Sequence, residues 1–214
     1  NRIVIPYSKI SKHLVDALIA TEDSRFYDHS GIDFIALGRA IIKRGLFGQA
    51  SAGGGSTITQ QLAKQLYSEQ AHNSLERIFQ KPIEWVIAVK LERNYTKEEI
   101  IALYLNYFDF LHNAVGIKTA ANTYFNKEAK NLNVVESAML IGLCKNPSLF
   151  NPVRYPERAK ERRNVVLGQM EKSGYLTHSE YEQYCDTPLT LDFHRTDHKD
   201  GEATYFREFL RQYM

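Results

Sequence analysis

Glu22 is the acidic residue whose position in the sequence best suits a proton transfer. It continues an apolar helix face that runs from Leu14 to Ile19, with the three- and four-residue spacing of one side of a helix. Partial burial disfavours the charged form of a carboxyl group, so such a residue accepts a proton near neutral pH and suits a general base. An ion pair with Arg25 at the end of the same helix is the alternative, and the residues alone leave both interpretations open.

The segment from Gly53 to Leu66 has the composition of an anion-binding helix start. Its three glycines leave backbone N–H groups accessible, and Thr57 forms a predicted capping box with Gln60, so the helix is expected to begin near Ile58. The polar side of this helix is made of Thr57, Gln60, Gln61 and Lys64.

These features together predict a site for an elongated anionic group. A helix N-terminus attracts anions through its N–H groups and its dipole. Lys64 lies about 10 Å along the axis at roughly 1.5 Å per residue, within reach of such a group. The order Gly-x-x-x-x-Gly-Lys-Ser/Thr of a nucleotide-binding loop is absent. A flexible loop that caps an ordinary surface helix is the alternative.

Further acidic and basic residues lie at helical spacing. Glu84 follows Lys81 by three residues, and Arg77 precedes Lys81 by four. A surface cluster of ion pairs is the alternative to a functional role for these three. Asp23 and His29 are compatible with a helix cap and a turn hydrogen bond as well as with chemistry.

A mainly helical chain is predicted to position these residues. Capping boxes, in which a polar side chain precedes a glutamate by three residues, start at Thr96, Asn133 and Thr177. Pro156 is expected in the first turn of a helix that ends before Gly174. Strand signals are limited to Arg2–Pro6 and Pro188–Phe193.

Composition excludes several classes of protein. The 214 residues are 43% hydrophobic and 24% charged, which is typical of one or two globular domains. A net charge of +2 gives no reason to expect a nucleic-acid partner. Cys144 and Cys185 are too few for a disulfide framework and lack the spacing of zinc ligands, so no metal site is predicted. No stretch approaches the roughly 20 apolar residues of a membrane span.

The chain is predicted to consist of a domain at 1–186 and a linker-like tail at 187–214. The stretch from Thr187 to Ala203 is polar and lacks apolar periodicity. Because the chain starts at Asn1 without a signal peptide, we expect it to be a piece of a longer protein. An anchor would precede it and another domain would follow it.

Four motifs in order resemble those of the peptidoglycan glycosyltransferase family, the glycan-polymerising domain of class A penicillin-binding proteins and of monofunctional transglycosylases. The resemblance extends from about Lys9 to Met170. The motifs are Glu-Asp-x-x-Phe-x-x-His-x-Gly from Glu22 to Gly31, Gly-Gly-Ser-Thr-Ile-Thr-Gln-Gln-x-x-Lys from Gly54 to Lys64, KEEIIALYLN from Lys97 to Asn106, and RRNVVL from Arg162 to Leu167.

One further family motif is altered in this chain. It is usually Arg-Lys-x-x-Glu, and here Gln80 takes the position of the arginine, while Lys81 and Glu84 match. Arg77, almost one turn earlier, is the candidate to supply the missing cation.

The resemblance implies a mainly α fold, with a lysozyme-like larger helical lobe and a smaller membrane-facing jaw lobe. It also implies polymerisation of lipid II into glycan chains by an inverting displacement that releases polyprenyl pyrophosphate. Glu22 would be the general base, supported by Asp23, and Glu84 would orient the cations or the second sugar. Substrate binding is assigned to His29, Gly55, Ser56, Thr57, Thr59, Gln60, Gln61, Lys64, Arg77 and Lys81. No cofactor is required, and the need for a divalent cation is left open.

The partners implied by the resemblance are lipid II, the growing glycan chain, the bacterial membrane surface and a covalently attached transpeptidase domain. The domain would lie at the outer, periplasmic face of the cytoplasmic membrane, anchored by a segment outside this chain. Leu46 and Phe47, next to Lys43 and Arg44, suit an interfacial contact with that membrane. Packing of these two apolar side chains on the core is the alternative.

Two other functions compete with glycan polymerisation. A lysozyme-like glycan-cleaving enzyme needs one catalytic acid and a groove for a polymer, but no pyrophosphate cradle, so Gly54 to Lys64 argues against it. An inactive helical cell-wall scaffold domain is made conceivable by Gln80, while intact Glu22, Lys64 and Glu84 argue against that function.

Overall fold

The computed structural model describes residues 3–47, 55–67 and 74–194, with backbone only for residues 41, 43–47 and 74–79. These residues form nine α-helices and no strand, so the predicted mainly α class is confirmed. The helices are α1 (Lys12–Glu22), α2 (Phe34–Phe47), α3 (Ile58–Tyr67), α4 (Ser74–Asn94), α5 (Lys97–Tyr107), α6 (Ile117–Phe125), α7 (Val134–Lys145), α8 (Pro156–Lys172) and α9 (His178–Asp186). Among them, none is long and apolar enough to cross a bilayer.

Local sequence signals place the helix starts correctly. All three predicted capping boxes form, with side chains that accept from the backbone N–H three residues later and glutamates that return the contact. Pro156 lies in the first turn of α8, and Gly174 follows the end of that helix with a φ of 77°. The predicted start of α3 at Ile58 is also confirmed.

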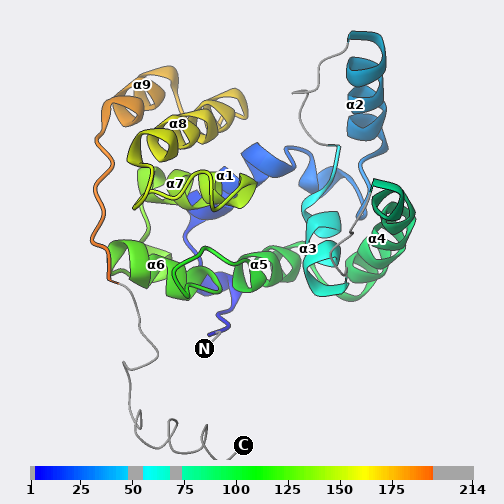
Figure 1. Ribbon diagram of the computed structural model, residues 1–214, viewed down its shortest axis with the longest axis horizontal. Coiled ribbons are helices and arrows are strands. Elements are labelled where there is room, and N and C mark those ends of the chain that lie inside the picture. The colour runs from blue at the N-terminus through cyan, green and yellow to red at the C-terminus, as the bar shows by residue number, and fades with distance from the viewer. Residues whose placement is uncertain (1–2, 48–54, 68–73, 195–214) are drawn as a thin grey trace, which may run out of the picture.

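The core forms around α1 and α7. The predicted apolar face of α1 is buried from Leu14 onward, and every residue of α7 from Ser137 to Leu143 is buried. Helix α1 packs against α7 and α8, while α3 packs against α4 and α5 (Figure 1). Because α1 ends at Glu22, this packing brings the acidic residue from the core to the side of the molecule where α2 and α3 lie.

The segment after α9 is extended but is not a strand. The N–H groups of Asp192 and His194 donate to carbonyl oxygens at the end of α6, at 3.1 and 2.8 Å. The alternating side chains of Leu189, Leu191 and Phe193 pack against the core. The predicted strand at 188–193 is therefore wrong, because the backbone partner is a helix end. The domain boundary after residue 186 stays a prediction.

The buried guanidinium of Arg163 fixes the exit of the chain from α9. Its Nη1 donates to the carbonyl oxygen of Thr187 at 2.8 Å, and its Nη2 donates to that of Cys185 at 3.1 Å. The side chain is 0% exposed, and burial lowers its pKa from the ordinary value. The motif RRNVVL thus includes a residue that holds two segments of the fold together.

Candidate active site

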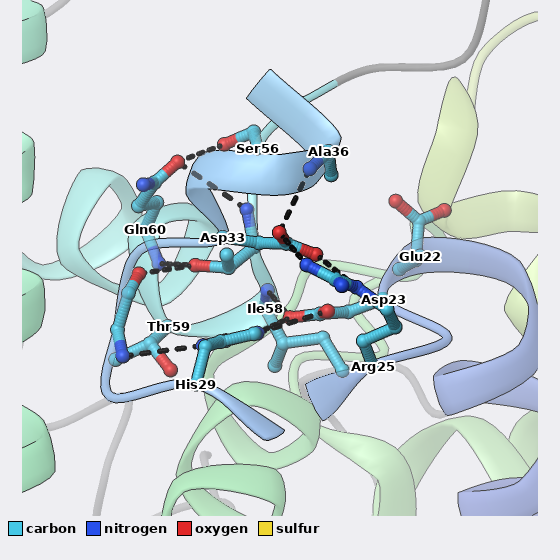
Figure 2. A network of polar contacts seen from close by, with 12 residues as sticks. Glu22, Asp23, Arg25, His29, Asp33, Ala36, Ser56, Ile58, Thr59 and Gln60 are labelled. Carbon is cyan, nitrogen blue, oxygen red and sulfur yellow. Dashed lines mark hydrogen bonds and ion pairs between the residues drawn. The ribbon is translucent and has the colours of Figure 1, made fainter. Parts of the chain in front are cut away.

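Asp23 connects the end of α1 to the start of α3. Both of its carboxylate oxygens lie 3.0 Å from Nε2 of His29, and the backbone N–H of Ile58 donates to Oδ2 at 3.1 Å (Figure 2). The N–H of Gly31 donates to Nδ1 of His29 at 3.2 Å, so Nε2 holds the ring proton and donates it to Asp23. The Asp23 carboxylate therefore satisfies donors within the protein, including one at a helix N-terminus.

Glu22 points away from this cluster. In Figure 2 its carboxylate lies apart from the contacts that join Asp23 to His29 and Ile58. Its Oε2 accepts a 2.8 Å hydrogen bond from Nε2 of Gln61, in the second turn of α3. Tyr104 of α5 donates to Oε1 of the same glutamine at 3.1 Å. The prediction that Glu22 is partly buried is confirmed, since the residue is half-buried.

Glu22 also lines a cavity of about 420 Å³. The walls come from the end of α1, the following turn, α2, the three residues before α3 and one residue of α8. The ionisable residues in these walls are Glu22, Asp23, Arg25, Asp33 and Arg39.

The two arginines of this cavity differ in their contacts. Arg25 forms a two-pronged ion pair with Asp33, whose side chain is 4% exposed. Burial alone would raise the pKa of Asp33, but hydrogen bonds from Arg25 and from the N–H of Ala36 hold it below the ordinary value. Arg39 is exposed and forms no ion pair within the described residues. It is the cation that this cavity offers to an anionic ligand.

The predicted capping box at the start of α3 is confirmed, but its side chains turn inward. Oγ1 of Thr57 accepts from the N–H of Gln60 at 3.1 Å and donates to the carbonyl oxygen of Gly31 at 2.7 Å. Oε1 of Gln60 accepts from Oγ of Ser56 at 3.1 Å and from the N–H of Thr57 at 3.3 Å (Figure 2). Thr57 and Gln60 are each 2% exposed. Their hydrogen bonds thus shape the loop before the helix.

Thr59 is likewise used inside the protein. It is 0% exposed, and its hydroxyl donates to Oε1 of Glu92 at 2.6 Å. Lys97 donates to the same oxygen at 2.9 Å and to the carbonyl oxygen of His29 at 2.7 Å. The predicted polar side of α3 is thus only partly open, because Thr57 and Gln60 are buried. The assignment of Thr57, Thr59 and Gln60 to substrate binding stays a prediction.

Ser56, Gln61 and Lys64 retain exposure on the same segment. Lys64 is exposed and forms no hydrogen bond or ion pair within the part of the chain that the structure describes. It follows Gln61 by three residues, so both side chains share a face of α3. Gly55 lets the backbone pass α2 closely, since an added Cβ would lie 3.2 Å from Cα of Leu37.

The altered third motif lies on α4. Lys81 donates to Oε2 of Glu84 at 2.7 Å, and the lysine side chain is 44% exposed while that of the glutamate is 4% exposed. Helix α4 packs against α3, so this pair belongs to the same part of the molecule as Lys64. The side chain of Arg77 lies outside the described residues, and the idea that it replaces the motif arginine stays a prediction.

The predicted membrane segment is described only in part. The side chains of residues 43–47, which include Leu46 and Phe47, lie outside the described residues, as do residues 48 and 49. On the same helix, Phe34, Ile35 and Ile42 are 70%, 63% and 53% exposed. These three residues carried no prediction, although their large apolar side chains are the signal that could have identified them.

The ion pair of Glu22 with Arg25, the alternative raised from the sequence, does not form, because Arg25 pairs with Asp33. The Arg25–Asp33 pair and Arg39 showed no local signal that they would line one cavity. Glu22 acts electrostatically on Tyr104, Cys144 and Arg162, which come from three different helices. Within the described residues, no three histidine, cysteine or acidic side chains are grouped to hold a metal ion.

Comparisons with known proteins agree with this arrangement. Residues 1–171 match the transglycosylase family. The chain is 39% identical over 213 residues to penicillin-binding protein 1A of Aquifex aeolicus, covering 100% of this chain and 28% of the relative. It is 42% identical over 210 residues to penicillin-binding protein 1F of Bacillus subtilis, covering 98% of this chain and 28% of the relative.

A solved structure shows the same fold. The crystal structure of penicillin-binding protein 1A from Haemophilus influenzae matches with a TM-score of 0.55 and 25% identity, over 100% of this chain and 21% of that chain. The two curated relatives named above are longer than this chain, which spans 28% of the length of each. The division into a lysozyme-like lobe and a jaw lobe stays a prediction. Since the family match covers 1–171 and includes every motif, the chain belongs to the transglycosylase family.

Proposed function

We propose that this domain is a peptidoglycan glycosyltransferase that polymerises lipid II into glycan chains and releases polyprenyl pyrophosphate. Membership of the transglycosylase family supports the proposal, as do the penicillin-binding proteins among its relatives. The observation on which it depends is the 2.8 Å hydrogen bond from Gln61 to Glu22. This bond holds a carboxylate at the wall of a cavity, beside the helix that contains Lys64.

The reaction needs a base at the acceptor sugar. Glu22 takes the proton of the 4-hydroxyl group of one lipid II molecule, and the hydroxyl oxygen attacks the anomeric carbon of the growing chain. The bond from that carbon to pyrophosphate breaks, and its electron pair leaves with the pyrophosphate. One displacement inverts the anomeric centre, without a covalent sugar–enzyme intermediate. Oε2 of Glu22 is held by Gln61, which leaves Oε1 for the acceptor hydroxyl.

The departing pyrophosphate needs cations where its charge develops. Lys64 is exposed and has no protein partner among the described residues, so its ammonium group is available to this anion. Lys81, positioned by the buried Glu84, is the second cation in the proposal. Asp23 and His29 support the site by docking α3 against the end of α1. The proposed reaction requires no cofactor.

The lipid tail of the substrate requires an approach to a membrane. The exposed side chains of Phe34, Ile35 and Ile42 on α2 suit contact with the apolar part of a bilayer. The proposed location is the outer face of the bacterial cytoplasmic membrane. Because the chain covers 28% of its relatives, we further propose an anchor and a covalently attached transpeptidase domain in the whole protein.

A polymerisation assay tests the proposal. Purified protein is incubated with fluorescent lipid II in detergent, and glycan products are separated by gel electrophoresis. We expect a ladder of products from the wild type and none from Glu22→Gln, which keeps the shape of the side chain but removes its basicity. Glu182→Gln removes an exposed carboxylate on α9 and is the matched control. Cleavage of isolated glycan strands without a ladder would overturn the proposal in favour of a glycan-cleaving enzyme.

A further inference from the structure

A line of hydrogen bonds leads from the core to Glu22. Tyr104 is 0% exposed in α5, and its hydroxyl donates to Oε1 of Gln61 at 3.1 Å. Nε2 of Gln61 in turn donates to Oε2 of Glu22 at 2.8 Å. The two hydrogen bonds thus join residues of three helices, and both are donated in the direction from Tyr104 toward Glu22.

The Tyr104 hydroxyl supports the amide orientation of Gln61 in which Nε2 faces the carboxylate. An amide group offers an oxygen that only accepts and a nitrogen that only donates. With the Tyr104 hydroxyl donating to Oε1, Nε2 is directed toward Glu22. The reversed amide would place Oε1 of Gln61 2.8 Å from a carboxylate oxygen, so two acceptors would repel each other. The Glu22 carboxylate, which only accepts, and the Tyr104 hydroxyl, which donates to Oε1, therefore favour the same amide orientation.

The surroundings keep this line polarised. Burial, followed by the nearby Cys144 thiol and Glu22, raises the pKa of Tyr104 well above the ordinary value, so the phenol retains the proton that it donates. Burial likewise raises the pKa of Cys144, which stays a neutral thiol. Four neighbouring helices each contribute one group near Glu22: Gln61 of α3, Tyr104 of α5, Cys144 of α7 and Arg162 of α8. The charged residues that share its cavity are Asp23, Arg25, Asp33 and Arg39.

We propose that Tyr104 is a positioning residue for the transferase reaction, which acts through Gln61 to orient the Glu22 carboxylate toward the acceptor hydroxyl. This inference rests on the proposed function. It assigns Gln61 to the orientation of the base, whereas the family resemblance suggested contact with substrate. The two roles differ in kinetics, because loss of a substrate contact raises KM, while loss of orientation lowers kcat.

The test compares two buried tyrosine hydroxyls. Tyr104→Phe removes the hydroxyl above Gln61 and keeps the ring. Tyr124→Phe removes a buried hydroxyl that donates to the carbonyl oxygen of Phe110 at 2.6 Å and forms no hydrogen bond with Glu22 or Gln61. Gln61→Leu removes the amide itself from a half-buried position and provides the same test should Tyr104→Phe unfold at the assay temperature. All variants are checked by circular dichroism.

We expect Tyr104→Phe to lower kcat about tenfold, the upper end of what one hydrogen bond between neutral groups contributes, with KM unchanged. Gln61→Leu should have the same effect, and the double variant should be no worse than the single ones.

Two readouts separate the failure of this inference from the failure of the proposed function. A wild type that makes no glycan from lipid II would refute the proposed function. An active wild type, with Tyr104→Phe matching Tyr124→Phe in kcat and in KM, would overturn the positioning role alone. The side-chain amide signal of Gln61 in a nitrogen–proton NMR spectrum gives a readout without turnover. It should shift in Tyr104→Phe and stay in place in Tyr124→Phe.

Discussion

Gln61 and Glu22 are 39 positions apart in the sequence and are joined by a hydrogen bond of 2.8 Å between the amide nitrogen and a carboxylate oxygen. This contact locates the proposed base against the polar face of α3. Since Lys64 follows Gln61 by three residues on that helix, the base and an exposed cation lie on one side of the molecule. A displacement at a sugar diphosphate needs such an arrangement, with an acceptor for the proton near a cation for the leaving group.

Asp23→Asn should destabilise the domain by about 2–4 kcal/mol, because it weakens two buried hydrogen bonds at once. The ring proton of His29 and the N–H of Ile58 both donate to this carboxylate, and an asparagine amide presents a donor to one of them. Urea unfolding followed by circular dichroism measures the change. Asp28→Asn, at an exposed position in the same turn, is the control and should stay near wild type. Equal midpoints for both variants would contradict a central role for Asp23.

Lys64→Ala should lower kcat/KM about a hundredfold, because the ammonium group stabilises the charge of the leaving group in the proposed reaction. Stability should not change, because the ammonium group has no partner among the described residues. Lys64→Arg should recover part of this loss by restoring the charge. The control is Lys118→Ala, which removes an exposed lysine on α6. Initial rates of glycan formation from lipid II give the comparison. Full activity in Lys64→Ala would mean that the pyrophosphate is held by other cations.

Asp33 should make stability depend on acid pH. Its pKa lies below the ordinary value of 3.8 because Arg25 and the N–H of Ala36 outweigh the effect of burial. The stabilisation is therefore complete above the unfolded-state pKa and is lost as pH falls through the lower folded-state value. Asp33→Asn should be less stable than wild type at pH 7, and the difference should shrink from about pH 5 to about pH 2. Thermal melts across that range test it, and a constant difference would contradict the assignment.

Helix boundaries could be predicted because they depend on residues close together in the sequence. The capping boxes at Thr96 and Thr177 and the glycine after α8 are contacts between neighbours, and all formed as expected. The strand predicted at 188–193 was wrong because a strand depends on residues far away in the sequence. Its alternation was real, since Leu189 and Leu191 face the core, but a strand also needs a partner strand, and the partner here is the end of α6.

The inward and outward faces of the site could not be predicted in the same way. Gln60 and Gln61 were both predicted on the polar side of α3, yet Gln60 is buried and bonds back to the N–H of Thr57, whereas Gln61 reaches Glu22. Which of them is open depends on how α4 and α5 pack against α3, and no local pattern encodes that packing. The same holds for Tyr104, whose role is visible only once α5 lies beside Gln61.

Gly116→Ala should destabilise the domain more than Gly174→Ala, although both glycines have a positive φ, of 85° and 77°. A Cβ at position 116 would lie 2.7 Å from the carbonyl oxygen of Asn106 at the end of α5, whereas nothing lies within 4 Å of one at position 174. Backbone strain alone predicts about 1 kcal/mol for Gly174→Ala, and the added clash predicts about 3 kcal/mol or more for Gly116→Ala. Denaturant unfolding gives both values. Because relief of the clash must displace the helix that contains Tyr104, Gly116→Ala should also lower kcat. The control is a larger substitution at position 174, chosen to lose the same amount of stability, and it should not lower kcat.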